Sequence, residues 1–127
     1  MKQTKIAFIG CGNMGRSLIG GLISNGHPPE LLCGADPDTG QRQQLARLFN
    51  ISVFADSNEA VEEASVVVLA VKPQAVSTSI LEIADSLKRQ RPLLVSIAAG
   101  IRLASLSKNA GENFPIVRVM PNTPALI

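Results

Sequence analysis

The chain has 127 residues, of which 46% are hydrophobic, and its formal net charge is +2. This length is typical of a single domain, and the apolar content favours a packed core over a disordered chain. The charges are scattered, and the aromatic residues are limited to four Phe. A nucleic-acid partner is therefore not expected, since basic patches and stacking platforms are both missing.

The start of the chain argues against export and membrane insertion. The apolar part of MKQTKIAFIG is too short for a signal peptide, and no apolar run reaches the roughly 18 to 20 residues that span a bilayer. We expect a soluble, cytoplasmic protein with no membrane partner. Cys11 and Cys33 have no C-x-x-C spacing, and with one histidine they argue against a metal site. Both cysteines are interpreted as small buried apolar residues, although Cys11 can also lie close to a bound cofactor.

Apolar, β-branched runs recur along the chain at regular intervals. Several are continuous rather than alternating, which is typical of parallel strands covered on both faces. The expected strands are residues 5–10, 31–36, 51–54, 65–70, 93–98 and 116–120.

The intervals between these runs have helical periodicity. A capping box at residues 56–59 predicts the start of a short helix. The expected helices are residues 16–25, 41–49, 57–64, 77–87 and, on weaker periodicity, 103–110. Strands that alternate with helices predict βαβ units, and the right-handed crossover rule favours a doubly wound parallel sheet. We therefore predict one α/β domain of Rossmann type, with about six strands and helices on both faces.

A glycine motif joins the first predicted strand to the first predicted helix. Gly10, Gly12 and Gly15 have the spacing G-x-G-x-x-G. In this setting the first glycine allows a tight turn, the second lets backbone approach a pyrophosphate, and the third lets the helix pack on the strand. The free N–H groups of the helix attract the phosphates. The motif predicts a dinucleotide site, and the alternative is a glycine bend without a ligand.

Asp36 follows the second predicted strand, about 20 residues past the glycines, where dinucleotide sites often place an acid that binds ribose hydroxyls. It can instead start the turn before Pro37, and both roles remain open. A carboxylate at this point repels a 2′-phosphate, so Asp36 in isolation favours NAD over NADP. Arg42 and Arg47 lie downstream and can compensate, but we interpret them as solvated helix charges.

Later strand ends carry further small or special residues. The fourth predicted strand ends in LAVKP, the fifth in SIAAG and the sixth in MPNTP. The carboxyl ends of parallel strands share one edge of a sheet, where ligands bind. These three segments therefore predict an extended ligand that crosses the sheet.

The segments GCGNMG, AVKP, SIAAG and RVMPNTPAL, in this order, resemble pyrroline-5-carboxylate reductase over the whole chain. MPNTP is the most specific of them. The resemblance implies an NAD(P)-dependent oxidoreductase of proline biosynthesis, which makes L-proline from the small-molecule substrate 1-pyrroline-5-carboxylate by hydride transfer from NADPH or NADH. It also implies that residues 1–127 form the NAD(P)-binding domain. The family's helical C-terminal domain, which forms the homo-oligomer and most of the substrate pocket, is expected to be absent from this chain.

The resemblance also assigns site residues. The pyrophosphate is held by Ile9, Gly10, Cys11, Gly12, Asn13, Met14 and Gly15. The adenosine ribose or its phosphate is contacted by Asp36 and Asn58. The nicotinamide side is lined by Ala70, Val71, Lys72, Pro73, Ile97, Ala98 and Ala99, while Asn122 and Thr123 approach nicotinamide and substrate.

No catalytic residue is firmly assigned, and Lys72, Asn122 and Thr123 are the candidates near nicotinamide and substrate. Lys72 either orients groups there or only closes its loop. A protonated cyclic imine already accepts hydride readily, so no general base is required. His27 is accordingly interpreted as a solvated surface histidine. Asp36 departs from the small polar residues of family members that use NADPH, which leaves the cofactor preference open.

Two other functions compete with the reductase. One is another dehydrogenase of similar build, such as a hydroxyacid or prephenate dehydrogenase, and the other is a non-catalytic NAD-sensing regulatory module. The first shares the glycine turn but lacks MPNTP, and the second has no need of AVKP or MPNTP. A methyltransferase is a more distant third.

Overall fold

The computed structural model describes residues 4–97 and 116–118, with side chains for the first of these ranges. Within them, a six-stranded parallel sheet has the order β3-β2-β1-β4-β5-β6. The strands are β1 (Ile6–Ile9), β2 (Leu32–Ala35), β3 (Ser52–Phe54), β4 (Val66–Leu69), β5 (Leu93–Ser96) and β6 (Ile116–Arg118). The doubly wound sheet predicted from the sequence is confirmed.

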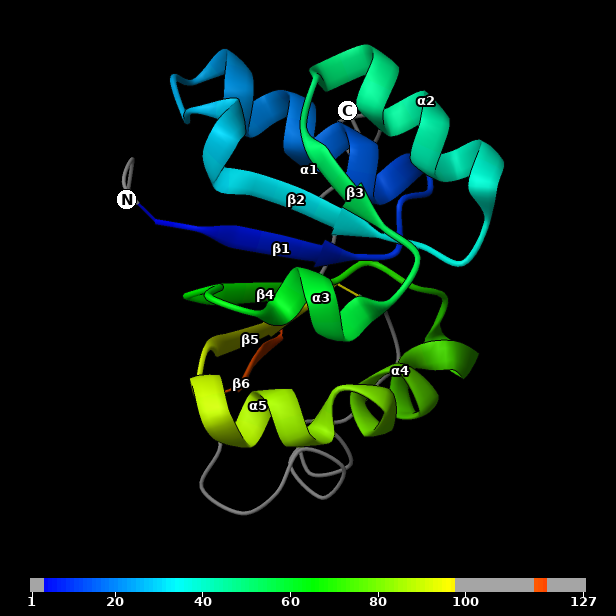
Figure 1. Ribbon diagram of the computed structural model, residues 1–127, viewed down its shortest axis with the longest axis vertical. Coiled ribbons are helices and arrows are strands. Elements are labelled where there is room, and N and C mark those ends of the chain that lie inside the picture. The colour runs from blue at the N-terminus through cyan, green and yellow to red at the C-terminus, as the bar shows by residue number, and fades with distance from the viewer. Residues whose placement is uncertain (1–3, 98–115, 119–127) are drawn as a thin grey trace, which may run out of the picture.

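The helices cover both faces of the sheet (Figure 1). On one face lie α1 (Asn13–Ser24) and α2 (Thr39–Phe49), and on the other α3 (Ser57–Val61), α4 (Val76–Glu82) and α5 (Ala84–Gln90). Two short 3₁₀ helices, η1 (Pro29–Leu31) and η2 (Pro73–Ala75), precede β2 and α4. No helix of the described part of the chain is long and apolar enough to cross a membrane.

The central strand β1 is continuously apolar because it is covered on both faces. Ala7 and Ile9 belong to the core under α3, α4 and α5, whereas Ile6 and Phe8 belong to the core under α1 and α2. Successive side chains point to opposite faces, so a strand covered on both sides needs apolar residues at every position. All four residues are buried.

The strand register brings three connections to one edge of the sheet. Ile9 pairs with Ala35 of β2 and with Leu69 of β4, so the three strands end side by side. The residues that follow, Gly10, Asp36 and Ala70, therefore begin their loops at neighbouring points. This edge is where the predicted site must lie.

Three helices begin or end differently from the sequence prediction. The helix expected over residues 16–25 spans Asn13–Ser24, with Gly12 as its N-cap. The helix expected from residue 41 begins at Thr39, because the Asp38 carboxylate caps it by accepting from the backbone N–H of Gly40 and Gln41. The helix after Asp56 is confirmed, with Asp56 as its cap, but it ends at Val61 rather than at residue 64.

The single helix expected over residues 77–87 is wrong, because the structure divides it at Ile83 into α4 and α5. The Asn58 side-chain amide donates to the carbonyl oxygen of Glu82 at 2.9 Å, and the Ser86 hydroxyl donates to Asn58 Oδ1 at 2.7 Å. A side chain inserted at a helix backbone is a known cause of a break. The helix expected over residues 103–110 lies outside the described residues.

Candidate functional site

The glycine turn after β1 requires glycine at two of its three positions. Gly10 has a φ of 99°, and a Cβ atom there would lie 2.8 Å from the carbonyl oxygen of Ala70. A Cβ atom on Gly15 would lie 2.7 Å from the carbonyl oxygen of Gly10. Gly10 thus permits the turn, and Gly15 lets α1 pack against it.

Gly12 differs from both, because its backbone is extended (φ −78°, ψ −166°) and a Cβ atom there would meet nothing within 4 Å. It is the N-cap of α1, where no side chain caps the helix and no acid lies in the first turn. The first N–H groups of α1 are therefore available to an anion. An open surface beside an uncapped helix N-terminus fits a pyrophosphate.

Two neighbouring cavities open at this edge of the sheet. The larger, of about 350 Å³, is lined by Gly12, Asp36, Gln41 and Lys72 among others. The smaller, of about 230 Å³, lies toward α3 and α4, where Ser57, Thr78, Ser79 and Glu82 contribute to its wall. Gly10, Asp36, Pro37, Val71 and Ala75 line both. Together the cavities run from the glycine turn past the ends of β2 and β4, which suits an extended ligand.

Asp36 joins two of the loops that border the larger cavity, those after β1 and β2. One carboxylate oxygen accepts from the backbone N–H of Cys11 at 2.9 Å, and the other accepts from the N–H of Asp38 at 2.9 Å. The turn role left open by the sequence is therefore real, and Asp36 also anchors the glycine turn. Its contact with a ribose remains a prediction.

Replacing Asp36 with alanine should lower the free energy of unfolding by about 2 kcal/mol, because two backbone donors lose a charged acceptor. Urea denaturation measures this effect. Asp85→Ala, which removes an exposed carboxylate on α5, is the matched control and should cost less than about 0.5 kcal/mol. Equal losses in the two variants would show that the anchor contributes nothing.

The two arginines behave differently. Arg42 donates to the carbonyl oxygen of Asp36 at 2.7 Å and to Thr39 Oγ1 at 3.1 Å, and it is half-buried. Its interpretation as a solvated helix charge is wrong, because it braces the loop after β2. Arg47 is exposed in the last turn of α2, as expected.

Asn58 has a structural role that the sequence did not reveal. Its amide bonds to Asp56 and to the Glu82 carbonyl, and its Oδ1 accepts from Ser86. These bonds hold α3 against the junction of α4 and α5, beside the smaller cavity. The contact of Asn58 with the adenosine ribose remains a prediction.

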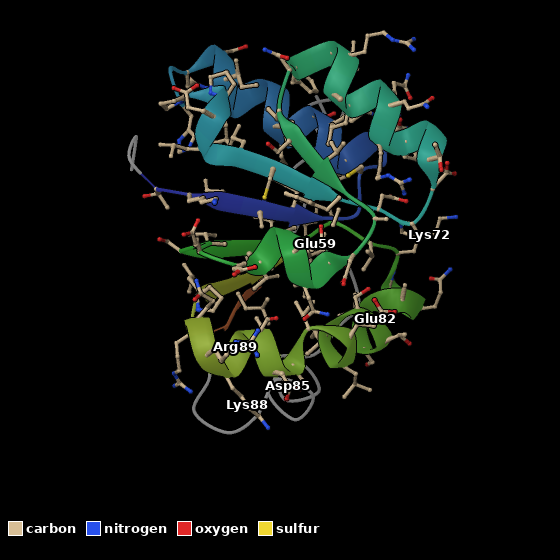
Figure 2. The ribbon with its side chains drawn as sticks, viewed as in Figure 1. Glu59, Lys72, Glu82, Asp85, Lys88 and Arg89 are labelled. Atoms are coloured by element: carbon tan, nitrogen blue, oxygen red, sulfur yellow. The ribbon has the colours of Figure 1, made fainter. Side chains whose placement is uncertain are left out.

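The residues expected on the nicotinamide side follow β4 and β5. Ala70 and Val71 line the larger cavity, and Lys72 is exposed on its rim as the residue that precedes η2. Figure 2 shows Lys72 in the connection beyond β4, with Glu82 below it on α4. Ile97 is buried after β5. Ala98, Ala99, Asn122 and Thr123 lie outside the described residues.

His27 is buried, with 6% of its surface exposed, so its interpretation as a solvated surface residue is wrong. Its Nε2 lies 2.8 Å from the carbonyl oxygen of Thr4. The turn that ends α1 explains this position. His27 N–H bonds to Leu22 O and Gly26 N–H bonds to Ile23 O, and Gly26 has a φ of 97°. This is a Schellman motif, which turns the next residue back onto the protein.

Both cysteines are free and buried, as expected. The Cys11 thiol lies 3.5 Å from the carbonyl oxygen of Ala35. Burial, with a smaller contribution from the Asp36 carboxylate, raises the pKa of Cys11 to about 12. Burial also raises the pKa of Cys33 to about 11. Neither thiol is poised as a nucleophile.

These thiols predict that the protein loses stability in alkaline solution. Above pH 9.0, the ordinary pKa of these thiols, the unfolded chain releases both protons while the folded chain keeps them. The unfolded state then binds fewer protons, so stability falls as pH rises, by about 2 to 3 kcal/mol at about pH 10. Urea denaturation across this range measures the slope. The Cys11→Ala/Cys33→Ala variant should be less stable overall but should lack this component, and an unchanged slope would contradict the assignment.

Gln41 is a site residue that the sequence did not single out. It lines the larger cavity, and its Oε1 is buried with no hydrogen-bond partner among the described residues. Buried acceptors are normally satisfied, so an orphaned one that lines a cavity is consistent with a ligand that donates a hydrogen bond. Its position on the first turn of α2, three residues after the cap, was the available signal.

Comparison with known proteins agrees with this geometry. The family described as NADP oxidoreductase coenzyme F420-dependent matches residues 5–100. The pyrroline-5-carboxylate reductase of Pseudomonas aeruginosa is 50% identical over 127 residues, which is 100% of this chain and 46% of that protein. The chain therefore spans about half the length of this curated relative.

Two solved structures have the same fold. A pyrroline-5-carboxylate reductase from Coxiella burnetii is 34% identical with a TM-score of 0.91, and the match covers 96% of this chain and 45% of that one. The pyrroline carboxylate reductase of Plasmodium falciparum, solved with NADP bound, is 28% identical with a TM-score of 0.82. That match covers 99% of this chain and 45% of the other.

Proposed function

The chain belongs to this NADP oxidoreductase family, and we propose that it is the dinucleotide-binding half of a reductase that converts 1-pyrroline-5-carboxylate to L-proline. The observation that carries the cofactor role is the open surface at Gly12 beside the uncapped N-terminus of α1. The names of the relatives supply the substrate.

The chain's own residues would hold the cofactor in an extended form along the sheet edge. The segment Ile9–Gly15 would bind the pyrophosphate through backbone N–H groups, without a charged side chain. Asp36 would fix the shape of that segment through Cys11 and would face the adenosine ribose. Asn58 would complete the adenosine end by holding the last turn of α4.

At the nicotinamide end, the segment Ala70–Pro73 together with Ile97, Ala98 and Ala99 would form the wall. A bound reduced nicotinamide would supply the hydride that the protonated imine accepts at carbon. The protein then has two tasks, which are to hold the two carbons together and to exclude water. Lys72, Asn122 and Thr123 are the residues of this chain that we place nearest the substrate.

The proposal extends to the whole protein. The small-molecule substrate would be held mostly by a helical domain that also forms a homo-oligomer, and the reaction would take place in the cytoplasm. Two observations support these points. The chain resembles the reductase family, and it matches only 46% of the length of the P. aeruginosa reductase, so that relative has a further part to which these roles are assigned.

A chimera tests the proposal directly. The matching part of the P. aeruginosa reductase, which is 50% identical, is replaced by this chain, and the loss of nicotinamide absorbance is followed with 1-pyrroline-5-carboxylate. Substrate-dependent oxidation of NADH or NADPH is expected. A folded chimera that binds either cofactor but does not reduce the imine would contradict the proposed reaction.

A further inference from the structure

One side of α1 is apolar and only partly covered. Met14 and Leu18 are four residues apart, and 40% and 37% of their surfaces are exposed. Leu22, four residues further on, is half-buried. Side chains at this spacing lie on the same side of a helix, so these three form a continuous apolar row. We refer to Met14, Leu18 and Leu22 as the α1 stripe.

The α1 stripe lies on the side of α1 that faces away from α2. The contact with α2 is at Gly20, where an added Cβ atom would lie 3.4 Å from the Phe49 ring. An α-helix turns by about 100° per residue, so Leu18 lies about 160° around α1 from Gly20. Ile19, which is buried in the core beneath α1, marks the side of the helix that faces the sheet. Because α2 covers β2 and β3, the stripe borders the sheet on the side of β4 and β5 (Figure 1).

The sheet surface beside the α1 stripe is incompletely covered as well. On β5, Leu93 is 37% exposed and Val95 is half-buried. Val66, the partner of Leu93 on β4, is also half-buried. Val66 and Val95 pack against the core beneath α1, and Leu93 is two residues from Val95, so all three lie on the α1 face. Leu94, on the opposite face of β5, is fully buried.

The described helices leave this surface open. On the α1 face the described part of the chain contributes only α1 and α2, and α2 lies over β2 and β3. Parallel strands are normally covered on both faces. Apolar surface that continues from a helix onto a sheet marks a contact with another element or chain. The α1 stripe and the residues Val66, Leu93 and Val95 therefore need a cover that the described residues do not supply.

The relatives indicate where this cover comes from. The chain matches 46% of the P. aeruginosa reductase and 45% of the C. burnetii structure, so more than half of each relative lies outside the match. In the sheet, β6 is the edge strand next to β5. A segment that continues past β6 therefore starts one strand away from the uncovered surface. A helix with one apolar side fits the angle between the side of α1 and the face of the sheet.

We propose that the α1 stripe and the half-exposed face of β4 and β5 are the docking surface for an amphipathic helix from the part of the reductase beyond the matched residues. The inference rests on the proposed function in one respect, since it takes the chain to be part of a longer reductase. The docked helix would hold α1 from the side opposite α2. Because we assign the N-terminus of α1 to the pyrophosphate, the second part of the reductase would then support the cofactor site directly.

Thiol labelling measures whether this surface is covered. The native thiols do not interfere, since Cys11 and Cys33 are 0% and 3% exposed. Leu48, an exposed leucine on α2, is the matched control. In the 127-residue chain alone, Leu18→Cys should react with a maleimide at a rate within about threefold of that of Leu48→Cys. In the chimera with the P. aeruginosa reductase, Leu18→Cys should react at least about tenfold more slowly, while Leu48→Cys keeps its rate.

Equal labelling of Leu18→Cys in the chain alone and in the folded chimera would overturn the docking surface. Slow labelling of the chain alone at every concentration would overturn it too, because the cover would then lie within these 127 residues. Slow labelling only in concentrated solution would make the occupant a second copy of the chain and would equally overturn the proposal. Reduction of the imine by the unmodified chimera is measured separately, so failure of the proposed function is recognised independently of the labelling.

Discussion

Replacing Gly12 with valine is expected to weaken NADH binding by at least about 100-fold, which corresponds to about 2.7 kcal/mol. Gly12 has ordinary extended backbone, and a Cβ atom there meets no atom of the protein within 4 Å. The added methyl groups would therefore occupy the open space that we assign to the pyrophosphate. The free energy of unfolding should change by less than about 1 kcal/mol, because no contact within the fold is lost.

Three other glycines separate this effect from a loss of folding. Gly21→Val adds the same side chain at an open position farther along α1, where nothing lies within 4 Å, and it should leave NADH binding intact. Gly10→Ala and Gly15→Ala would force contacts of 2.8 Å and 2.7 Å with backbone oxygens, so they should reduce stability. NADH fluorescence and urea denaturation measure the two properties. Unchanged affinity in Gly12→Val would remove the pyrophosphate from this turn.

The central strands β1 and β2 were predictable from the sequence because every one of their residues is buried. In β1 both faces are buried, so the run IAFI has no polar position, and its length and location follow directly. The glycine spacing was equally informative, since the turn needs a positive φ at Gly10 and close packing at Gly15. Such local requirements are visible in a single stretch of sequence.

The features that were missed depend on residues far apart in the chain. The break between α4 and α5 involves Asn58, which is 24 residues from Glu82 and 28 from Ser86. The apolar periodicity predicted one continuous helix, because Ile80 and Leu87 both belong to the core. The Schellman turn at Gly26 that directs His27 inward is local, but the carbonyl oxygen that its Nε2 meets belongs to Thr4, 23 residues earlier. No local pattern encodes these contacts.

In the candidate site too, some residues could be predicted from the sequence and others could not. The residues that follow the strands, Gly10, Asp36 and Ala70, could be assigned because parallel strands end at one edge. The role of Gln41 could not, because an unpartnered oxygen becomes visible only when the surrounding atoms are placed. Asp36 is intermediate. The turn role considered for it is seen in its bond to the Asp38 N–H, whereas its bond to Cys11 became visible only in the fold.

The 127-residue chain on its own is expected to bind NADH but to leave 1-pyrroline-5-carboxylate unreduced. The cavity residues that we can assign to the cofactor lie on this chain, around the glycine turn and the ends of β2 and β4. Hydride transfer additionally requires the imine to be held against the nicotinamide. Orientation of this kind contributes up to roughly 7 to 11 kcal/mol to lowering the barrier. Without it, reduction should be too slow to detect.

To orient the imine, the enzyme must also bind the carboxylate of the substrate. Lys72 is the cation that lines the larger cavity among the described residues, and it is exposed on the rim rather than enclosed. An exposed lysine holds a carboxylate only weakly, because water screens the pair. The resemblance assigns tighter capture to the helical domain, in the part of the relatives that this chain does not match.

The assay compares the chain alone with the chimera at equal concentration, after NADH fluorescence has shown that both bind the cofactor. Oxidation of NADH that depends on 1-pyrroline-5-carboxylate should occur in the chimera and not in the chain alone. Turnover by the chain alone at a comparable rate would contradict this division of roles. It would place the substrate site on these 127 residues, and Lys72→Ala should then abolish turnover while leaving NADH binding intact.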